Sequence, residues 1–237
     1  MSRSAPTLPA WDRVTALFGG TFDPPHLGHR EAVRGLFSNP GAKRVIILPS
    51  ATPPLKPNFT SIEHRLEMTR LTFSSTLSDP FPKEVEIDLS EVTRSRDGRP
   101  SYSFDTLSEM RSNHPALAFV IGADQMQNLP RWHRFPELLD LCHWIVLTRK
   151  PDGEKAIHRA LADWQASGLV KGHTMTDSNL WTLRSGTTFL KVVSTQAPQL
   201  SSTEIRETIA LKGTPPAQSL LPEVMAYLKL HRIYGTR

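Results

Sequence analysis

The chain has 237 residues, of which 38% are hydrophobic, with 28 lysine and arginine residues against 23 aspartate and glutamate residues. This length and hydrophobic content suffice to bury the core of one α/β domain, and a single cysteine, Cys142, excludes an intramolecular disulfide. No apolar stretch approaches a membrane span, and residues 1–13 lack the apolar core of a signal peptide, so we expect a cytoplasmic protein.

The formal net charge of +5 and the isoelectric point near 9.6 are compatible with nucleic-acid binding but do not require it. Basic residues are scattered, and the densest group, Arg94, Arg96 and Arg99, sits beside Asp97-Gly98 in an expected loop. Small phosphorylated substrates explain the positive charge equally well. We therefore expect neither a nucleic-acid nor a membrane partner, and the oligomeric state stays unknown.

Strand-like and helix-like segments alternate along the chain, which predicts an α/β, Rossmann-like parallel sheet with helices on both faces and a C-terminal helical segment. Residues 1–13 are expected to form a loosely ordered extension and residues 14–237 a single domain, in which 152–188 is a variable segment of one helix and connecting loops and 201–237 holds the C-terminal helices. The strands are expected at Val14–Phe18, Arg44–Leu48, Val85–Leu89, Leu117–Ile121, Trp144–Leu147 and Phe189–Val193. The helices are expected at Leu27–Phe37, Ser61–Ser74, Phe104–Arg111, Pro136–Leu141 and Ala156–Gln165, the second opened by a capping box, Thr60-x-x-Glu63.

A run rich in glycine, proline and histidine joins the first expected strand to the first expected helix: Gly19-Gly20-Thr21-Phe22-Asp23-Pro24-Pro25-His26-Leu27-Gly28-His29. Because Gly19 and Gly20 lack a Cβ, a ligand can approach their backbone, and the helix start offers unpaired N–H groups to phosphate. His26 and His29 differ by three positions, so both can face one ligand as donors to phosphate oxygens. The run therefore predicts a phosphate-binding loop in which neither histidine needs to act as a base.

Two other interpretations of this run stay open. Gly-Gly and Pro-Pro can form an ordinary turn with incidental histidines, which is the better interpretation of each short motif alone but not of the whole run. A metal site is less favoured, because no other cluster at ligand spacing accompanies the two histidines. We predict no metal held by protein side chains.

The run resembles the HxGH signature of the nucleotidyltransferase superfamily, in the form found in bacterial nicotinate-mononucleotide adenylyltransferases, Gly-Gly-Thr-Phe-Asp-Pro-x-His-x-Gly-His. The resemblance implies transfer of AMP from ATP to nicotinate mononucleotide, which forms nicotinate adenine dinucleotide and pyrophosphate in NAD biosynthesis. Mg²⁺ is expected to accompany ATP, held mostly by substrate oxygens and water. The nearest alternative is an adenylyltransferase for nicotinamide mononucleotide or another phosphorylated acceptor. The distant alternative is a non-catalytic nucleotide- or RNA-binding protein.

Further motifs of this family follow the later strands, where ligands of such sheets bind. After the second strand, Pro53-Pro54-Leu55-Lys56 resembles the family's Pro-Pro-His-Lys, with leucine in place of histidine; by composition alone, Lys56 is an ordinary surface lysine. After the third strand, Ser101-Tyr102-Ser103-Phe104-Asp105-Thr106 resembles the family's Ser-Tyr-Thr-x-Asp-Thr. The resemblance implies that Ser103 presents its backbone amide to the nicotinate carboxylate, and the alternative is a helix N-cap.

After the fourth strand, Gly122-Ala123-Asp124 and the pair Trp132-His133 resemble the family's Gly-x-Asp and Trp-Tyr elements. The resemblance implies that Asp124 binds a ribose hydroxyl, that Trp132 stacks on the pyridine ring, and that His133 contributes a backbone amide. Core packing is the alternative for Trp132. After the fifth strand, Arg149 matches the family's Arg-Pro element, with an ordinary solvated arginine as the alternative.

Near the end of the chain, Leu200-Ser201-Ser202-Thr203-Glu204-Ile205-Arg206 resembles the superfamily's second signature, Ile-Ser-Ser-Thr-x-Ile-Arg, and a capping box, Ser201-x-x-Glu204, is the alternative. The catalytic residues that the two signatures imply are His26, His29 and Arg206. The implied ATP-binding residues are Gly19, Gly20, Thr21, Phe22, His26, His29, Gly122, Asp124, Ser201, Ser202, Thr203 and Arg206. The implied mononucleotide-binding residues are Asp23, Lys56, Ser103, Thr106, Trp132, His133 and Arg149.

Overall fold

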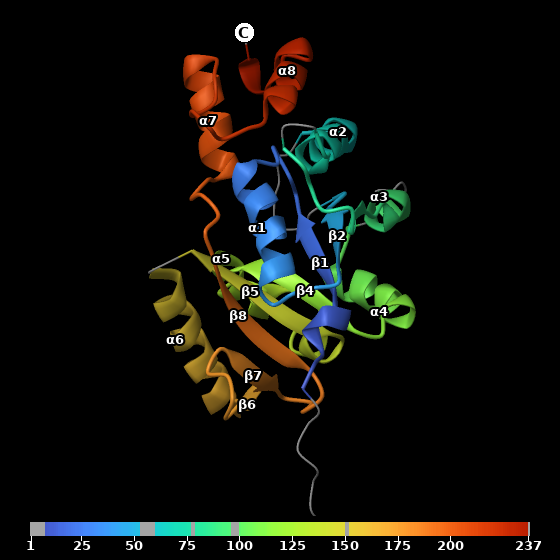
Figure 1. The fold of residues 1–237 in the computed structure, drawn as a ribbon, viewed down its shortest axis with the longest axis vertical. Helices are drawn as coiled ribbons and strands as arrows, with labels where there is room; N and C mark the ends of the chain where they lie inside the picture. Colours follow the sequence, from blue (N-terminus) through green and yellow to red (C-terminus); the bar gives the residue numbers. More distant parts are fainter. Residues whose placement is uncertain (1–7, 53–59, 77–78, 96–99, 150–151, 237) are drawn as a thin grey trace, which may run out of the picture. The chain divides into compact units, whose positions relative to one another are not determined.

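The computed structural model describes residues 8–52, 60–76, 79–95, 100–149 and 152–236, in which strands and helices alternate (Figure 1). The strands are β1 (Thr15–Gly20), β2 (Arg44–Pro49), β3 (Val85–Ile87), β4 (Leu117–Gly122), β5 (His143–Arg149), β6 (Val170–His173), β7 (Leu180–Leu183) and β8 (Phe189–Thr195). The α-helices are α1 (Leu27–Ser38), α2 (Ile62–Phe73), α3 (Ser90–Arg94), α4 (Ser103–Asn113), α5 (Ala123–Met126), α6 (Asp152–Ala166), α7 (Ser202–Lys212) and α8 (Pro222–Leu230). Short 3-10 helices are η1 (Trp11–Arg13), η3 (Leu129–Arg131), η4 (Glu137–Asp140) and η5 (Ile233–Gly235).

The strands form a sheet in the order β3-β2-β1-β4-β5-β8-β7-β6. Strands β1, β4, β5 and β8 pair in parallel, whereas β6 and β7 add an antiparallel edge. The predicted α/β, Rossmann-like class is confirmed, with a sheet that is mixed and mostly parallel. The prediction of only a helix and loops over 152–188 is wrong, because β6 and β7 follow α6. Each has only four residues, and neither shows the alternation of apolar and polar side chains that marks a strand. In addition, β6 is irregular at Gly172, which has φ of 140° next to a register shift.

The chain divides into two compact units. The first comprises Met1–Phe18, Leu36–Val45 and Tyr102–Thr195, and its core contains the buried strands β4, β5 and β8, flanked by α4 and α6 on opposite sides in Figure 1. The second comprises Gly19–Gly35, Ile46–Ser101 and Gln196–Arg237, and it contains α2, α7 and α8. The domain boundaries drawn from the sequence stay predictions.

Every strand expected from the sequence is present, with ends that differ by at most two residues. The last expected helix begins four residues early, at Asp152, and the helix expected before β5 is instead the 3-10 helix η4. The capping box at Thr60 is wrong, because α2 begins at Ile62 with Ser61 in the N-cap position. Within the extension that we expected to be loosely ordered, Trp11–Arg13 form η1.

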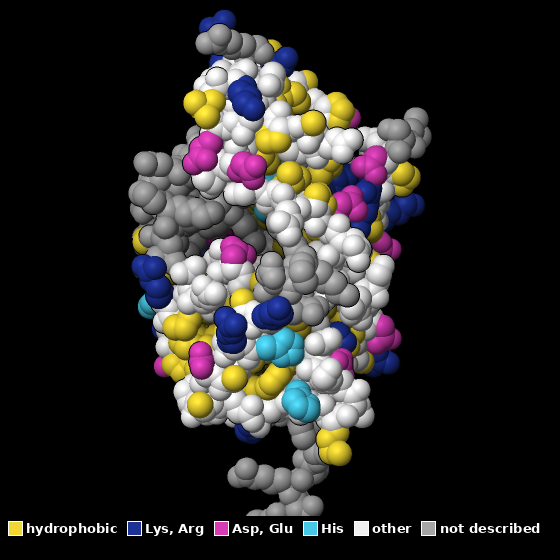
Figure 2. All heavy atoms as spheres, turned by 90° about the vertical axis from the view of Figure 1, so that its left-hand side faces the viewer, with side chains coloured by type: hydrophobic (Ala, Val, Ile, Leu, Met, Phe, Trp, Pro, Cys, Tyr) yellow, Lys and Arg dark blue, Asp and Glu magenta, His cyan; other side chains and the backbone are white. Residues whose placement is uncertain are grey.

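Lysine and arginine side chains are interspersed with aspartate and glutamate on the face drawn in Figure 2, in keeping with their scatter along the sequence. No helix in the described ranges combines the length and the apolar character that crossing a bilayer requires.

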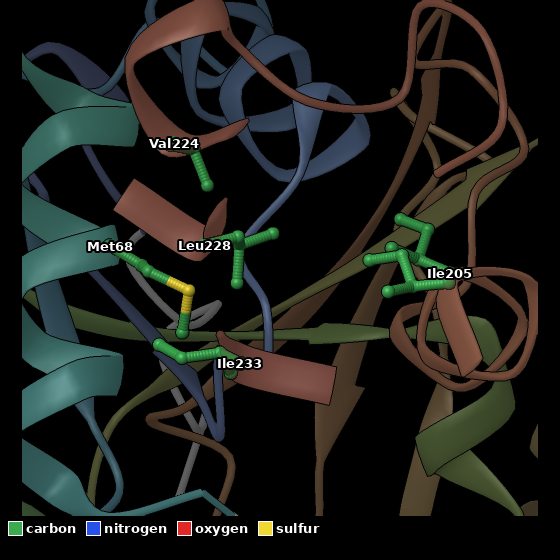
Figure 3. Close-up of a cluster of buried hydrophobic side chains, with 6 residues drawn as sticks. Met68, Ile205, Val224, Leu228 and Ile233 are labelled. Atoms are coloured by element: carbon green, nitrogen blue, oxygen red, sulfur yellow. The ribbon is translucent and has the colours of Figure 1, made fainter. Parts of the chain in front are cut away.

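A buried apolar cluster in the second unit joins α2 to the C-terminal helices. Met68 of α2 packs with Val224 and Leu228 of α8 and Ile233 of η5, and Figure 3 shows these four side chains converging. Residues of α7 complete the cluster, namely Ile205 and Ile209. Burial of these side chains fixes the C-terminal segment against α2.

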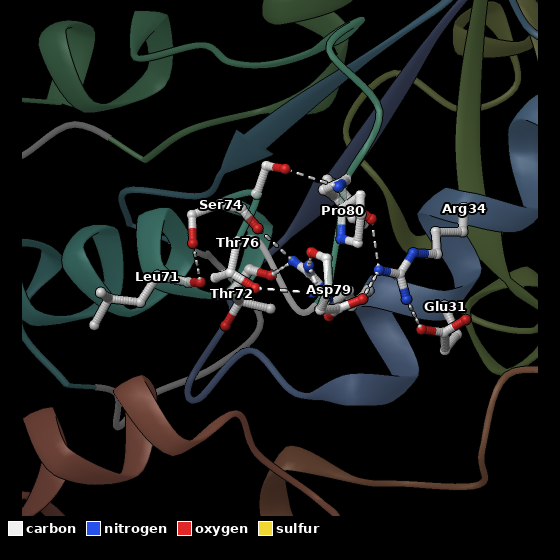
Figure 4. A network of polar contacts seen from close by, with 11 residues as sticks. Glu31, Arg34, Leu71, Thr72, Ser74, Thr76, Asp79 and Pro80 are labelled. Carbon is white, nitrogen blue, oxygen red and sulfur yellow. Dashed lines mark hydrogen bonds and ion pairs between the residues drawn. The ribbon is translucent and has the colours of Figure 1, made fainter.

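Two arginines of α1 bind the end of α2 and the segment that follows it, and Figure 4 shows Arg34 with Asp79 and Pro80. Arg30 is fully buried and donates to the Asp79 carboxylate at 2.9 Å from Nε and to the backbone oxygens of Thr72 and Ser74. Arg34 donates to the same carboxylate and to the backbone oxygen of Pro80 at 3.0 Å. A buried guanidinium is tolerated only when its donors are satisfied, and these acceptors satisfy those of Arg30. The network therefore fixes α1, and with it the loop in front of α1.

The apolar cluster predicts a large difference between two leucines of the same helix. Leu228 is 0% exposed and Leu230 is 77% exposed, although both belong to α8. Leu228→Ala should lower the free energy of unfolding by about 2–5 kcal/mol, because it leaves a cavity among α2, α8 and η5. Leu230→Ala should change it by less than about 0.5 kcal/mol. Urea denaturation of both variants measures the two values, and equal losses would contradict the packing described.

The arginine network predicts an acid-dependent contribution to stability. Burial acts to raise the pKa of Asp79, but the hydrogen bond from Arg34 and the charges of Arg30 and Arg34 outweigh it and hold that pKa below its usual range. Since the folded pKa lies below the unfolded value of about 3.9, the carboxylate stabilises the fold above that pH, and the contribution disappears as pH falls through the folded pKa. Melting temperatures measured from pH 7 to pH 3 should show the wild type above Asp79→Asn at neutral pH, with the gap closing below about pH 4. A constant gap would be inconsistent with this assignment.

Candidate phosphate-binding site

The loop between β1 and α1 folds over the ring of Phe22. Phe22 is 2% exposed and has φ of 51°, and its ring meets the rings of His29 and Phe73 edge-on, at centroid distances of 5.2 and 6.0 Å. A Cβ on Gly20 would lie 2.8 Å from the Phe22 ring. Glycine at position 20 is therefore needed for Phe22 to pack, besides any approach of a ligand.

The two histidines of the loop form a reciprocal pair. Their rings stack at a centroid distance of 3.7 Å and an angle of 22°. The backbone N–H of His26 donates to Nδ1 of His29 at 3.2 Å, and the backbone N–H of His29 donates to Nδ1 of His26 at 3.3 Å. Because each Nδ1 accepts a hydrogen bond, each neutral ring carries its proton on Nε2. In this tautomer the hydrogen on each ring is carried by Nε2, and an N–H group of this kind can donate to a phosphate oxygen.

The start of α1 differs from the expectation of unpaired amides. Leu27 N–H donates to the backbone oxygen of Ser219 at 2.9 Å, and His29 N–H donates to His26. Two of the first three N–H groups of this helix are therefore bonded within the chain and are not unpaired donors.

Gly28 lies between the two histidines and tolerates little added volume. A Cβ at position 28 would lie 3.0 Å from Cε1 and Nδ1 of His26 and 3.0 Å from the backbone oxygen of Pro198. The glycine between the histidines of the signature thus lets the His26 ring lie flat against the first turn of α1.

The second signature lies against the first. Ser202, the first residue of α7, donates from Oγ to the backbone oxygen of Pro24 at 2.9 Å. Arg206 donates from Nη1 to the backbone oxygen of Asp23 at 2.6 Å and from Nη2 to Thr203 Oγ1 at 3.3 Å. Ser201 occupies the N-cap position of α7 but makes no capping hydrogen bond with its side chain, so the capping-box alternative is wrong. The structure therefore brings the loop and the residues of the second signature together.

Asp23 is buried, 4% exposed, and its carboxylate is held by the chain itself. The hydroxyl of Tyr234 donates to Oδ1, and the backbone N–H of Thr60 donates to Oδ2 at 3.2 Å. Burial, followed by the charge of Asp23, raises the pKa of Tyr234 far above its usual value, so the phenol stays protonated and donates. These contacts make Asp23 an anchor of the loop, and its expected contact with the mononucleotide stays a prediction.

Arg65 of α2 is a residue of the site that the sequence did not indicate. It is 0% exposed and donates to the backbone oxygens of four residues at 2.6–2.8 Å. Burial lowers its pKa, which the charge of Asp23 opposes. An arginine in an amphipathic helix looks like a surface residue, and backbone acceptors leave no pattern in the sequence. The four oxygens belong to Thr21, Ser50, Ala51 and Thr60.

The first unit holds another group of the expected residues. A Cβ on Gly122 would lie 2.5 Å from Asp124 Oδ1, so glycine allows this carboxylate to fold back over the end of β4. The ring of His133 stacks on Tyr102 at 4.4 Å, and the ring of half-buried Trp132 meets Phe119 edge-on at 6.1 Å. A partly exposed aromatic ring such as that of Trp132 is the kind of group on which a flat heterocycle can stack.

The remaining expected residues have simpler placements. Ser103 is the first residue of α4, and Thr106 is buried in its first turn, where its hydroxyl donates to the backbone oxygen of Tyr102 at 3.4 Å. Arg149 is the last residue of β5, and its side chain lies outside the described part of the structure. Lys56 also lies outside the described residues. Among the residues that are described, no three His, Cys, Asp or Glu side chains cluster as metal ligands.

Comparisons with known proteins identify the family and the fold. A family described as cytidylyltransferase-like matches residues 17–208. The probable nicotinate-nucleotide adenylyltransferase of Serratia proteamaculans is 33% identical over 223 residues, covering 92% of this chain and 94% of that protein. That of Aeromonas hydrophila is 32% identical over 224 residues, covering 92% and 95%. The solved structure of Plasmodium falciparum nicotinic acid mononucleotide adenylyltransferase complexed with NaAD shares the fold, with a TM-score of 0.69 at 15% identity over 95% of this chain and 98% of that one.

Two glycines of α1 should respond in opposite ways to alanine. Gly28→Ala places a Cβ against the His26 ring and the Pro198 oxygen, and it should lower the melting temperature. A Cβ at Gly35 would meet nothing within 4 Å among the described residues, so Gly35→Ala should add about 0.5–1 kcal/mol of stability by removing a flexible residue from the helix. Thermal and urea unfolding of both variants test this, and a stabilised Gly28→Ala protein would show that the contact at position 28 is not tight.

Proposed function

Because this chain belongs to the cytidylyltransferase-like family, and within it to the nicotinate-nucleotide adenylyltransferases, we propose that it transfers AMP from ATP to nicotinate mononucleotide, forming nicotinate adenine dinucleotide and pyrophosphate in NAD biosynthesis. The observation that carries the proposal to particular residues is the stacked pair His26 and His29, with Arg206 bonded to the same loop.

The proposed reaction is one in-line displacement. An oxygen of the mononucleotide 5′-phosphate attacks the α-phosphorus of ATP, and the bond from that phosphorus to the oxygen bridging it to the β-phosphate breaks, so pyrophosphate leaves. A phosphate monoester has a second pKa of about 6, so the nucleophile is already an anion near neutral pH and needs no general base. The work left to the protein is alignment and neutralisation of charge.

The two histidines suit that work. In the tautomer set by their reciprocal hydrogen bonds, His26 and His29 donate from Nε2 to phosphate oxygens without a change of protonation state during the reaction. Arg206 adds a fixed positive charge next to the loop. Gly19, Gly20, Thr21, Phe22, Gly122, Asp124, Ser201, Ser202 and Thr203 complete the proposed ATP site.

The mononucleotide is proposed to bind Asp23, in the loop after β1, and residues that follow β2, β3, β4 and β5. Support for the pyridine subsite comes from half-buried Trp132 and from the start of α4 at Ser103, where first-turn amides and the positive end of the helix dipole suit a carboxylate. The other proposed ligands are Asp23, Lys56, Thr106, His133 and Arg149. Mg²⁺ is proposed to enter with ATP, bound by phosphate oxygens and water, where it would neutralise phosphate charge.

Purified protein with ATP and Mg²⁺, offered nicotinate mononucleotide, nicotinamide mononucleotide and phosphopantetheine in separate reactions, tests the function. Pyrophosphate release should be fastest with nicotinate mononucleotide. Faster release with nicotinamide mononucleotide would overturn the choice of acceptor, and no release with either pyridine nucleotide would overturn the function.

The role of His29 can be separated from general damage with a matched set of variants. His29→Ala removes a donor used in the transition state and should lower kcat at least a hundredfold, about 3 kcal/mol of transition-state stabilisation. His29→Gln should retain more activity than His29→Ala, because its amide nitrogen can occupy the place of Nε2. His158→Ala, at an exposed position of α6, serves as the control and should keep the wild-type kcat. Near-normal turnover of His29→Ala would refute the donor role.

A further inference from the structure

We propose that Tyr234 is a positioning residue for the adenylyl transfer, acting on the histidine pair through the buried carboxylate of Asp23. The inference rests on the function proposed above and extends it to a residue of the C-terminal segment, far from both histidines in the sequence.

A hydrogen bond between Tyr234 and Asp23 joins the C-terminal segment to the loop. Asp23 and Tyr234 lie 211 positions apart in the sequence, and the phenol hydroxyl donates to Asp23 Oδ1 while Thr60 N–H donates to Oδ2. Both oxygens of a nearly inaccessible carboxylate thus have a donor within the chain. Loss of either donor would leave a buried acceptor without that partner, a cost in free energy that a shift of the loop can reduce.

Asp23 is also linked to the proposed catalytic groups Arg206 and His29. Its backbone oxygen accepts the hydrogen bond from Arg206, so the position of Asp23 also sets the position of that guanidinium. Its neighbour Phe22 packs edge-on against the ring of His29. A shift of Asp23 would therefore move both the guanidinium of Arg206 and the ring of His29.

The backbone conformation around Tyr234 is held by neighbouring contacts. Arg232 and Tyr234 both adopt left-handed backbone conformations, with φ of 51° and 59°, which residues with a Cβ rarely adopt. Between them, Ile233 is buried in the apolar cluster, and beyond them Thr236 donates from Oγ1 to the backbone oxygen of Leu228 at 2.7 Å. The surroundings thus impose this conformation, and its result is to direct the phenol at Asp23.

The chain offers a matched control for Tyr234→Phe. The hydroxyl of Tyr227, on α8, forms a hydrogen bond with His64 Nδ1 at 2.9 Å, and that bond does not involve the loop. Burial raises the pKa of Tyr227, as it does that of Tyr234. Tyr227→Phe therefore removes a comparable group from the same C-terminal segment without freeing Asp23.

The test measures kcat and KM for Tyr234→Phe, Tyr227→Phe, Asp23→Asn and the double variant Tyr234→Phe/Asp23→Asn, well below their melting temperatures. We expect Tyr234→Phe to lower kcat about tenfold or more, because misplaced donors stabilise the transition state less. The KM values for ATP and for the mononucleotide should change by less. Tyr227→Phe should stay within about twofold of wild type. In the Asp23→Asn background, Tyr234→Phe should have less than half of its effect on log kcat, since the two residues act as one unit.

A second readout does not depend on turnover. In ¹H–¹⁵N spectra of the imidazole rings, Tyr234→Phe should shift the signals of His26 and His29, and Tyr227→Phe those of His64. Unchanged His26 and His29 signals, a wild-type kcat in Tyr234→Phe, or an equal effect in both backgrounds would overturn the inference. If the wild type releases no pyrophosphate while the spectra change as expected, the proposed function fails and the coupling between Tyr234 and the histidines stands.

Discussion

The arrangement of the candidate site depends on one buried guanidinium. Arg65 gives hydrogen bonds to the residue that follows β1, to two residues that follow β2 and to the residue two positions before α2. Burial of an arginine is unfavourable unless its donors find acceptors, and here four backbone oxygens supply them. Because these oxygens come from separate segments, the guanidinium can be satisfied only when the segments are adjacent. The hydrogen bonds of one side chain thus fix the loops that follow β1 and β2.

The loop between β1 and α1 is held by contacts from three parts of the second unit. Arg206 and Ser202 bond its backbone oxygens from α7, Tyr234 and the Thr60 amide bond its carboxylate, and the arginines of α1 fix the helix behind it. A phosphate site that works by alignment gains from this redundancy, because donors already in place need no reorganisation during the reaction. The loop reaches its conformation through partners, and not through local preference, as the left-handed φ of Phe22 shows.

Much of this could be predicted from the sequence, for reasons that also explain the failures. Most strands that were predicted are apolar runs between turn residues, and the two signatures were found because each is contiguous. Arg65 was missed because its partners are backbone atoms, and β6 because it is short and broken at Gly172. Asp23 was assigned to ligand binding from the family resemblance, and only the fold shows that the hydroxyl of Tyr234 lies beside its carboxylate. The amides at the start of α1 were expected to be unpaired because Ser219 is remote in the sequence.

The use of backbone acceptors has a consequence for how such a site changes over evolutionary time. Arg65, Arg206 and Ser202 each bind main-chain oxygens, and a main-chain oxygen is present whatever residue occupies the position. Substitutions at Thr21 or Ser50 therefore leave these hydrogen bonds available, and such contacts produce no paired substitutions between sequences. Asp23 and Tyr234 form a hydrogen bond through their side chains, so a substitution of either one removes the partner of the other. Covariation between aligned positions can detect a side-chain pair such as Asp23 and Tyr234, but it cannot detect the hydrogen bonds from Arg65 to backbone oxygens.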